Sequence, residues 1–170
     1  SVTSYFGTGT QKADSRVTAD VRQDLELHHL AYLALTLTVS DGLKGGNPAI
    51  TSVVEGLLVE TWSGTAWSAA KSYSRNPAAC VRDFILSSRY GQGRAKANLD
   101  EASFGSIYEY CEELVDAPSG KEARYRLDYT VDTQRPVDDV LNDMMATFLG
   151  SLVYSGNKVK LKTEKAETIT

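Results

Sequence analysis

The sequence is poor in the features that most directly reveal a function. No apolar run among its 170 residues approaches the roughly 20 residues that cross a bilayer, so we expect no membrane span. Lysine and arginine number 18 against 22 aspartates and glutamates, and this net charge of −4 argues against a nucleic-acid-binding surface. The only histidines, His28 and His29, are adjacent, and adjacent side chains on a strand point to opposite faces. We therefore expect them to share neither a metal nor a substrate.

Cysteine is equally scarce. The two cysteines, Cys80 and Cys111, fall in separate predicted helices and are too few for a disulfide framework. We expect reduced thiols that pack in the core. The alternative, a bridge between them, depends on Cα and Cβ geometry that a sequence does not supply.

Motifs of the common enzyme classes are missing too. There is no Gly-x-Ser-x-Gly elbow, and a serine without a usable histidine lacks its base. Gly91-Gln-Gly93 and the stretch from Gly42 to Gly46 lack the strand–glycine–helix context of a phosphate loop. Two groups of carboxylates fit solvated helix faces better than acid–base pairs: Glu109, Glu112 and Glu113, and Asp138, Asp139 and Asp143. We predict no catalytic residue, no cofactor and no metal ligand.

What the sequence does contain is typical of a folded, globular chain. Its hydrophobic content of 42% and charged content of 24% are ordinary, and its length allows one medium domain or two small ones. Because it begins at Ser1, without an initiator methionine or a leader, we expect a piece of a longer polypeptide.

Composition and periodicity predict an α+β fold of antiparallel strands and hairpins with about three helices. The chain divides into a polar arm at 1–20, a strand-rich segment at 21–73, a helix-rich α+β segment at 74–162 and a polar tail at 163–170. The arm, without sustained periodicity, is expected to be a loop or to need a partner for order.

Alternation of apolar and polar residues predicts the strands. It does so at Leu35–Val39, at Ile50–Thr61 with a turn or bulge at Glu55-Gly56, in a Trp62–Lys71 hairpin, at Arg124–Val131, and in a hairpin of Leu152–Tyr154 with Val159–Leu161. The region from Arg124 to Leu161 is expected to form a small antiparallel sheet covered by one helix. Asp41–Pro48 is predicted to be a loop.

Capping residues and apolar stripes predict three helices. Asn76 and Pro77 begin the first, which runs to Ser88 and buries Val81, Phe84 and Ile85 before glycines 91 and 93 turn the chain. Asp100 begins the second, which ends at Ala117–Gly120; its expected buried residues are Phe104, Ile107, Tyr108, Cys111 and Leu114. Asp132 or Thr133 caps the third, and Gly150 closes it; its stripe is Val137, Val140, Leu141, Met144, Met145 and Phe148.

Three aromatic residues are the only candidate ligand-binding side chains. Trp62, Trp67 and Tyr73 could stack on a sugar ring, but two tryptophans that flank a short hairpin more often close a small core. Core packing is the favoured interpretation.

Several separated segments together resemble one family, the central tail-tip proteins of long-tailed bacteriophages, also called host-specificity, tip-attachment or lambda J-like proteins. In chain order they are Gly7–Arg16, Ala31-Tyr-Leu-Ala34, Asn76-Pro77-Ala78 with Asp83-Phe84 and Arg89-Tyr-Gly-Gln-Gly93, Asp100–Phe104 with Tyr110-Cys-Glu-Glu113, Val131-Asp-Thr-Gln-Arg-Pro136, Val140-Leu-Asn-Asp143, and Gly150–Gly156. Each segment alone is weak, and their shared order makes the match specific. One departure is Leu127-Asp-Tyr-Thr130, which stands where many relatives have a Cys-Asn-Gly turn.

The resemblance implies a hub-body fragment of a phage or prophage tail tip, with a baseplate-hub-like fold. It implies a non-enzymatic structural protein of the virion, made in the host cytoplasm. Its implied partners are other tail-tip and tail-tube proteins, with a homotrimer in the full-length protein and no nucleic acid. The alternatives are a carbohydrate- or receptor-binding module of a tail tip, using the three aromatic residues, and a peptidoglycan-cleaving tail enzyme.

Overall fold

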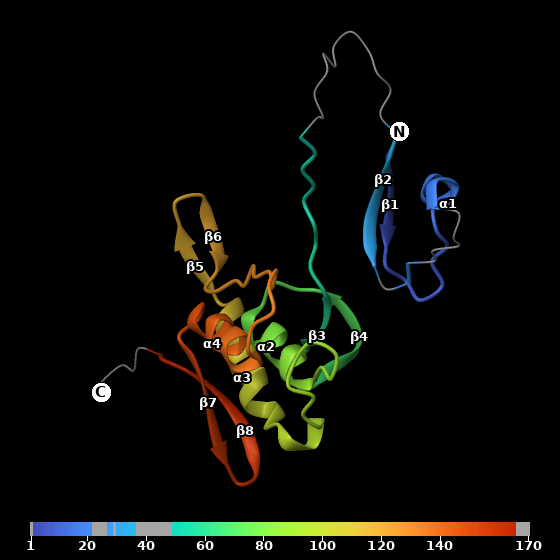
Figure 1. The fold of residues 1–170 in the computed structure, drawn as a ribbon. Helices are drawn as coiled ribbons and strands as arrows, with labels where there is room; N and C mark the ends of the chain where they lie inside the picture. Colours follow the sequence, from blue (N-terminus) through green and yellow to red (C-terminus); the bar gives the residue numbers. More distant parts are fainter. Residues whose placement is uncertain (1, 22–26, 29, 37–48, 166–170) are drawn as a thin grey trace, which may run out of the picture. The chain divides into compact units, whose positions relative to one another are not determined.

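The computed structural model describes the whole chain except residues 1, 22–26, 29, 37–48 and 166–170 (Figure 1). The described residues divide into two compact units, Ser1–Ser52 and Val53–Thr170. Their boundary falls inside the segment 21–73 that the sequence predicts to be strand-rich.

The first unit is built on one antiparallel strand pair. β1 (Val2–Phe6) pairs with β2 (Ala31–Leu35), and α1 (Ser15–Val21) lies between them in the sequence. The expectation of a loop or arm before residue 20 is therefore wrong, because this segment supplies a strand and a helix of its own. Of the strand predicted at Leu35–Val39, only Leu35 is in β2 and residues 37–39 lie outside the described residues, as does the loop predicted at 41–48.

The second unit combines three helices with three antiparallel hairpins. Its hairpins are β3 (Leu58–Trp62) with β4 (Trp67–Tyr73), β5 (Leu114–Ala117) with β6 (Gly120–Ala123), and β7 (Gly150–Ser155) with β8 (Lys158–Thr163). Its helices are α2 (Pro77–Leu86), α3 (Glu101–Glu112) and α4 (Val137–Ala146), with a short 3-10 turn, η1 (Lys96–Asn98). The predicted α+β class is confirmed.

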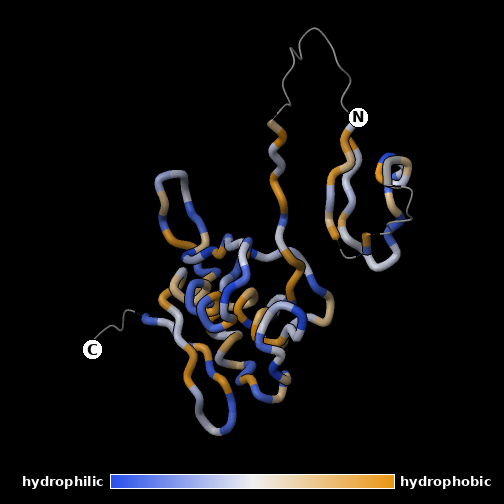
Figure 2. Tube along the Cα trace, viewed as in Figure 1, coloured by the Kyte–Doolittle hydropathy of each residue, from blue (hydrophilic) through white to orange (hydrophobic). Residues whose placement is uncertain are grey.

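The core of the second unit lies between its three helices and the β7–β8 hairpin (Figure 1). Apolar segments gather there in the centre of the unit (Figure 2). Its most deeply buried large apolar side chains are Val81, Ile85, Leu99, Phe104, Cys111, Phe148, Val159 and Leu161. Val59 at the β3–β4 hairpin is buried as well, with 3% of its surface exposed.

α2 follows its prediction closely. The Asn76 Oδ1 accepts hydrogen bonds from the amides of Ala78 (3.0 Å) and Ala79 (3.4 Å), and the predicted apolar face is buried. The helix ends at Leu86, two residues before the predicted end. Gly91 has a specific packing reason, since a Cβ there would lie 1.6 Å from the Phe84 carbonyl oxygen.

α3 also begins as predicted, with the Asp100 side chain accepting a bond from the Ser103 amide (3.2 Å). Leu114, however, is 65% exposed and belongs to β5, so its predicted burial is wrong. The Ala117–Gly120 stretch does not end a helix but forms the turn of the β5–β6 hairpin, where Gly120 has a φ of 126°.

The predicted strand at Arg124–Val131 is wrong, and so is the sheet expected to contain it. The Arg124 amide donates to the Glu113 carbonyl (2.9 Å) and the Leu127 amide to the Arg75 carbonyl (2.8 Å). These bonds hold the chain across the end of α3 and the start of α2, and no ladder forms there among the described residues.

The predictions for α4 and for the turn after it are confirmed only in part. α4 begins after Pro136 and no side chain caps it, so Asp132 and Thr133 are not its cap, although its apolar stripe is buried from Val140 onward. Gly150 is the first residue of β7, and Leu149, with a φ of 54°, makes the turn that Gly150 was expected to make.

Both predicted tight hairpins are confirmed. Trp62 pairs with Trp67 across the first, whose register shift lies between Glu60 and Trp62 and not at the predicted residues 55–56. Gly156 and Asn157, each with a φ of 60°, form the second turn.

Replacing Phe84 tests the apolar contact between α2 and the core. Phe84 is 8% exposed within the core cluster, so Phe84→Ala should lower the free energy of unfolding by about 3–5 kcal/mol. Chemical denaturation measures it, with Leu114→Ala as the control because that side chain is 65% exposed. Equal losses in the two variants would contradict the assigned core.

Candidate functional site

The three candidate aromatic residues do not form one platform. Trp62 and Trp67 lie together at the turn end of the β3–β4 hairpin, with ring centroids 5.4 Å apart. Tyr73 pairs with Leu58 at the opposite end of the same ladder. A single ligand that stacks on all three is therefore not favoured by their placement.

The tryptophans are tied to α3. The Trp62 Nε1 donates to the Glu109 Oε1 (2.9 Å), and a Cβ at Gly105 would lie 2.5 Å from the Trp62 ring. Trp67 meets Tyr108 edge to face, with centroids 5.8 Å apart. Glycine at 105 thus lets the indole lie directly on the helix. Stacking on a sugar stays a prediction for these residues.

A buried arginine joins the hairpin to both helices. Arg82 of α2 keeps 2% of its side chain exposed and donates two bonds to the Glu101 carboxylate, at 2.8 and 3.0 Å. A third bond, of 2.9 Å, reaches Glu60 on β3, and the guanidinium carbon lies 4.4 Å from the Trp67 ring centroid. Glu60, Glu101 and Trp67 belong to β3, α3 and β4, so the side chain of Arg82 holds these three elements against α2. The sequence gives a weak signal for it, a charged residue within an apolar helix face.

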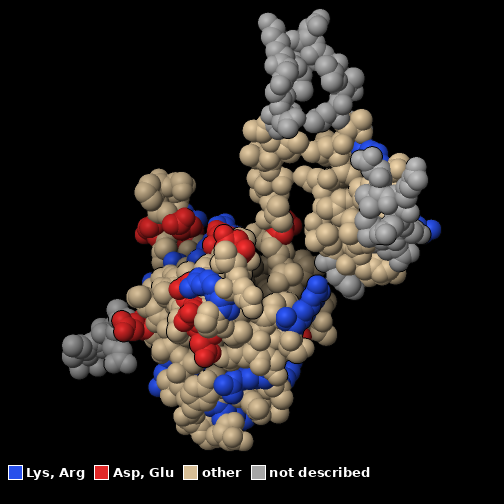
Figure 3. Space-filling model, viewed as in Figure 1, with Lys and Arg blue, Asp and Glu red and all other residues tan. Residues whose placement is uncertain are grey.

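The acidic residues of α3 are structural contacts. Glu109 holds Trp62, Glu112 accepts from the Asn76 Nδ2 (3.0 Å), and Glu113 pairs with Arg124 (2.7 Å). On the face shown in Figure 3, basic and acidic side chains lie next to one another on the second unit. These charged side chains therefore form hydrogen bonds and ion pairs within the second unit.

Both cysteines are free thiols in surroundings that disfavour the thiolate. Burial raises the pKa of Cys80 to about 11 and that of Cys111 to about 12. Both thiols are therefore protonated at neutral pH and are poor nucleophiles.

No group of three histidine, cysteine, aspartate or glutamate side chains that could hold a metal ion occurs in the described part of the chain. Within the same residues, no helix is both long and apolar enough to cross a membrane.

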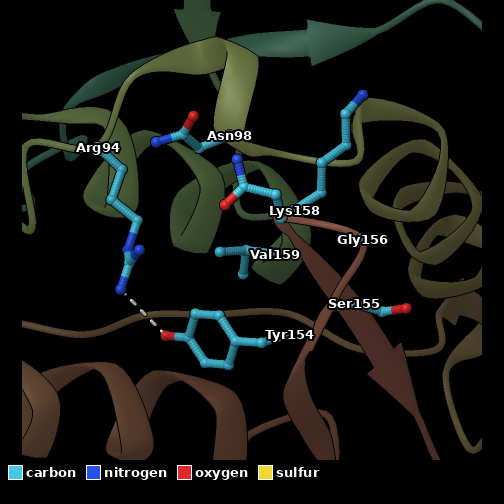
Figure 4. Close-up of a pocket in the computed structure, with 8 residues that line it drawn as sticks. Arg94, Asn98, Tyr154, Ser155, Gly156, Lys158 and Val159 are labelled. Carbon is cyan, nitrogen blue, oxygen red and sulfur yellow. Dashed lines mark hydrogen bonds between the residues drawn. The ribbon is translucent and has the colours of Figure 1, made fainter.

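A small polar hollow of about 250 Å³ lies at the turn of the β7–β8 hairpin (Figure 4). Arg94 donates to the Tyr154 hydroxyl (3.1 Å) and lies over its ring. Lys158 also lines the hollow, but its amine points away from Arg94 in Figure 4. The polar groups do not converge on one point, so we assign no ligand to the hollow.

A larger groove, of about 780 Å³, runs along the second unit. The segment before β3 and the unpaired stretch from Leu127 to Val131 both line it, and Tyr73 lies there too. Its deeper polar contact is Asp83, which accepts from the Lys71 amine (2.7 Å) and from the Tyr90 hydroxyl.

Each charged side chain that lines the groove is paired with one of opposite charge. Its charged lining residues are Arg75, Asp83, Asp128 and Arg135, and each has an opposite partner: Asp128 for Arg75, Lys71 for Asp83, and Asp143 for Arg135. The bond from Arg75 lowers the pKa of Asp128, and burial together with Asp83 raises the pKa of Tyr90 to about 12. Near neutral pH Asp128 is therefore charged and the Tyr90 phenol is not.

The first unit is held by a buried polar network. Tyr5 stacks on Tyr32 at 4.5 Å, and the Tyr5 hydroxyl donates to Asp14 (2.7 Å). Gln11, 7% exposed, accepts from the Gly7 amide (2.9 Å) and donates to the carbonyls of residues 27 and 30. Arg16 closes the network with bonds of 2.6 and 2.5 Å to Asp14.

The chain is similar in sequence to known phage proteins. No protein-family model matches the sequence. A protein of Escherichia phage SECphi27 named "Tip attachment protein J" is 28% identical over 109 residues, which is 62% of this chain and 9% of that protein. A protein of the same name from Escherichia phage SECphi4 is 31% identical over 101 residues, 58% of this chain and 8% of the relative. The chain is J-like in sequence. It spans less than a tenth of either relative, and the resemblance to tail-tip proteins is confirmed.

The residues that carry the J-like resemblance have structural roles. Gln11 and Asp14 hold the first unit, Asn76 caps α2, and Asp100 caps α3. Gly91 permits the close approach to the Phe84 carbonyl. Each of these positions therefore has a contact within the fold that accounts for its residue type.

Removing one partner of Arg82 should be costly. Glu101→Ala leaves a buried guanidinium with Glu60 alone, and we expect a loss of about 3 kcal/mol in the free energy of unfolding. Glu113→Ala is the matched control because the ion pair of Glu113 with Arg124 is exposed. We expect this variant to lose less than about 1 kcal/mol in the free energy of unfolding. Similar losses measured by urea denaturation would refute the central role of Arg82.

The first unit should loosen in acid. The bonds from Arg16 lower the Asp14 pKa below its ordinary 3.8, so the stabilisation is complete above that value and is lost as the pH falls below it. Amide exchange of β1 and β2, measured between pH 6 and about pH 3, should slow less than the intrinsic exchange rate does, and this difference is the excess exchange caused by opening of the unit. Asp14→Asn should reduce this excess, and an unchanged excess in the variant would count against the assignment.

Proposed function

We propose that the chain is a hub-body segment of a phage or prophage tail tip, acting by protein–protein assembly at the distal end of the tail tube. In this role it supports host attachment as part of the virion, after synthesis in the host cytoplasm. The observation that carries the proposal is the similarity of about 60% of the chain to two tip attachment proteins.

A structural role also fits the chemistry of the described residues. Their carboxylates cap helices and bind arginines, and both thiols are protonated at neutral pH. The names of the two relatives imply a structural and not a catalytic role, which supports a non-enzymatic segment. Its partners would be other tail-tip and tail-tube proteins, with a homotrimer in the full-length protein.

Immunoelectron microscopy of purified phage particles tests the assignment. Antibodies raised against the 170-residue chain should label the distal end of the tail, and tryptic peptides of the chain should be found in those particles. Label on the capsid, or particles without these peptides, would refute the tail-tip role.

Carbohydrate binding is a second candidate, favoured by one observation. Tyr73 lies on the large groove together with Tyr90 and Tyr129, so three tyrosines surround one hollow. Binding to a glycan array that is lost in Tyr73→Ala, while thermal melting shows the variant folded, would favour it. No binding to any glycan would leave assembly as the function.

A further inference from the structure

Two segments in which the sequence predicts a strand, but which the structure leaves unpaired, line the same groove. Of the stretch Ile50–Thr61, only residues from Leu58 onward join a ladder, and none of Arg124–Val131 does. Val54, Gly56 and Leu57 line the groove, as does every residue from Leu127 to Val131. The strand preference of the sequence and the observed structure thus disagree along this groove, and such a disagreement is common at functional sites.

The backbone of both segments is available for pairing. The backbone groups of 53–56 and of 128–131 form no hydrogen bond with any described residue. Backbone with open donors and acceptors is a template for an additional strand.

Apolar side chains accompany this backbone. Val131 is 52% exposed and Tyr129 37%, whereas Leu127, on the same side of the alternation, is buried at 6%. Val54 and Leu57 are 75% and 65% exposed, and the segment leading into β3 is largely apolar (Figure 2). A strand laid along the groove would cover these side chains and satisfy the open backbone at once.

The charge balance restricts the occupant. Every charged residue that lines the groove already has an opposite partner, as described above. An incoming charge would lose water without gaining a counter-ion, which is unfavourable. The groove therefore suits a segment without charged side chains.

We propose that this groove binds an extended, uncharged segment of a different protein chain, which adds as a strand along 128–131 and covers Tyr129 and Val131. The inference rests on the proposed function only in that the partner would be another tail protein. The binding itself is a property of the purified chain.

Selection from a displayed library of random peptides, roughly nine residues long, tests the proposal on the full 170-residue chain. Enriched peptides should be uncharged, with alternating apolar side chains. One synthetic enriched peptide should slow amide exchange at 128–131 by about tenfold or more, and the same peptide with a central proline should not, because proline cannot donate to a ladder.

Two adjacent substitutions provide a matched pair. Val131→Lys places a charge in the groove and should weaken binding of the peptide by about tenfold or more. Asp132→Lys introduces the same side chain at an exposed neighbour that does not line the groove, and should bind as the unaltered chain does. Thermal melting of both variants verifies that each is folded.

Several outcomes would overturn the inference. They are no enrichment, enrichment of charged peptides, protection confined to other residues, or equal weakening by both substitutions. Concentration-dependent dimerisation that protects 128–131 would assign the groove to a second copy and would equally reject the proposed partner. Failure of the virion labelling with successful peptide binding would reject the tail-tip role alone.

Discussion

The bonds of Arg82 are the constraint on which the second unit depends. A guanidinium with 2% exposure requires charged partners, and these come from β3 and α3 while the arginine itself belongs to α2. Burying that charge without both carboxylates would be strongly unfavourable, so the relative placement of the three elements is defined by one side chain. The Trp67 ring stacked on the guanidinium extends the constraint to β4.

The helices show where a sequence suffices. Asn76 and Asp100 cap α2 and α3 as expected, and the stripe of α4 is buried, because capping and 3.6-residue periodicity are local properties. The tight hairpin turns are local as well, and the Gly156-Asn157 turn follows from the two residues that best adopt positive φ.

Some errors are local, such as the cap of α4 and the end of α3, but the larger ones concern contacts between distant residues. Nothing near Tyr129 indicates that its backbone finds no partner, since alternation describes side chains and not the strand beside them. The arrangement of residues 2–20 also depends on distant contacts, because Gln11 and Asp14 are bonded to residues some 16 to 18 positions later. The Arg82 cluster and the groove were missed for the same reason: their members are far apart in the sequence.

These facts together describe what the second unit leaves open for a binding partner. The charged groups bind one another within the unit, which leaves few charges to define a polar interface. What the groove still offers is backbone without hydrogen-bond partners among the described residues, beside exposed apolar side chains. Backbone pairing supplies direction and register, and the alternation of the apolar side chains decides which face of a partner strand is accepted. Strand addition therefore uses the two properties that folding of this unit leaves unsatisfied.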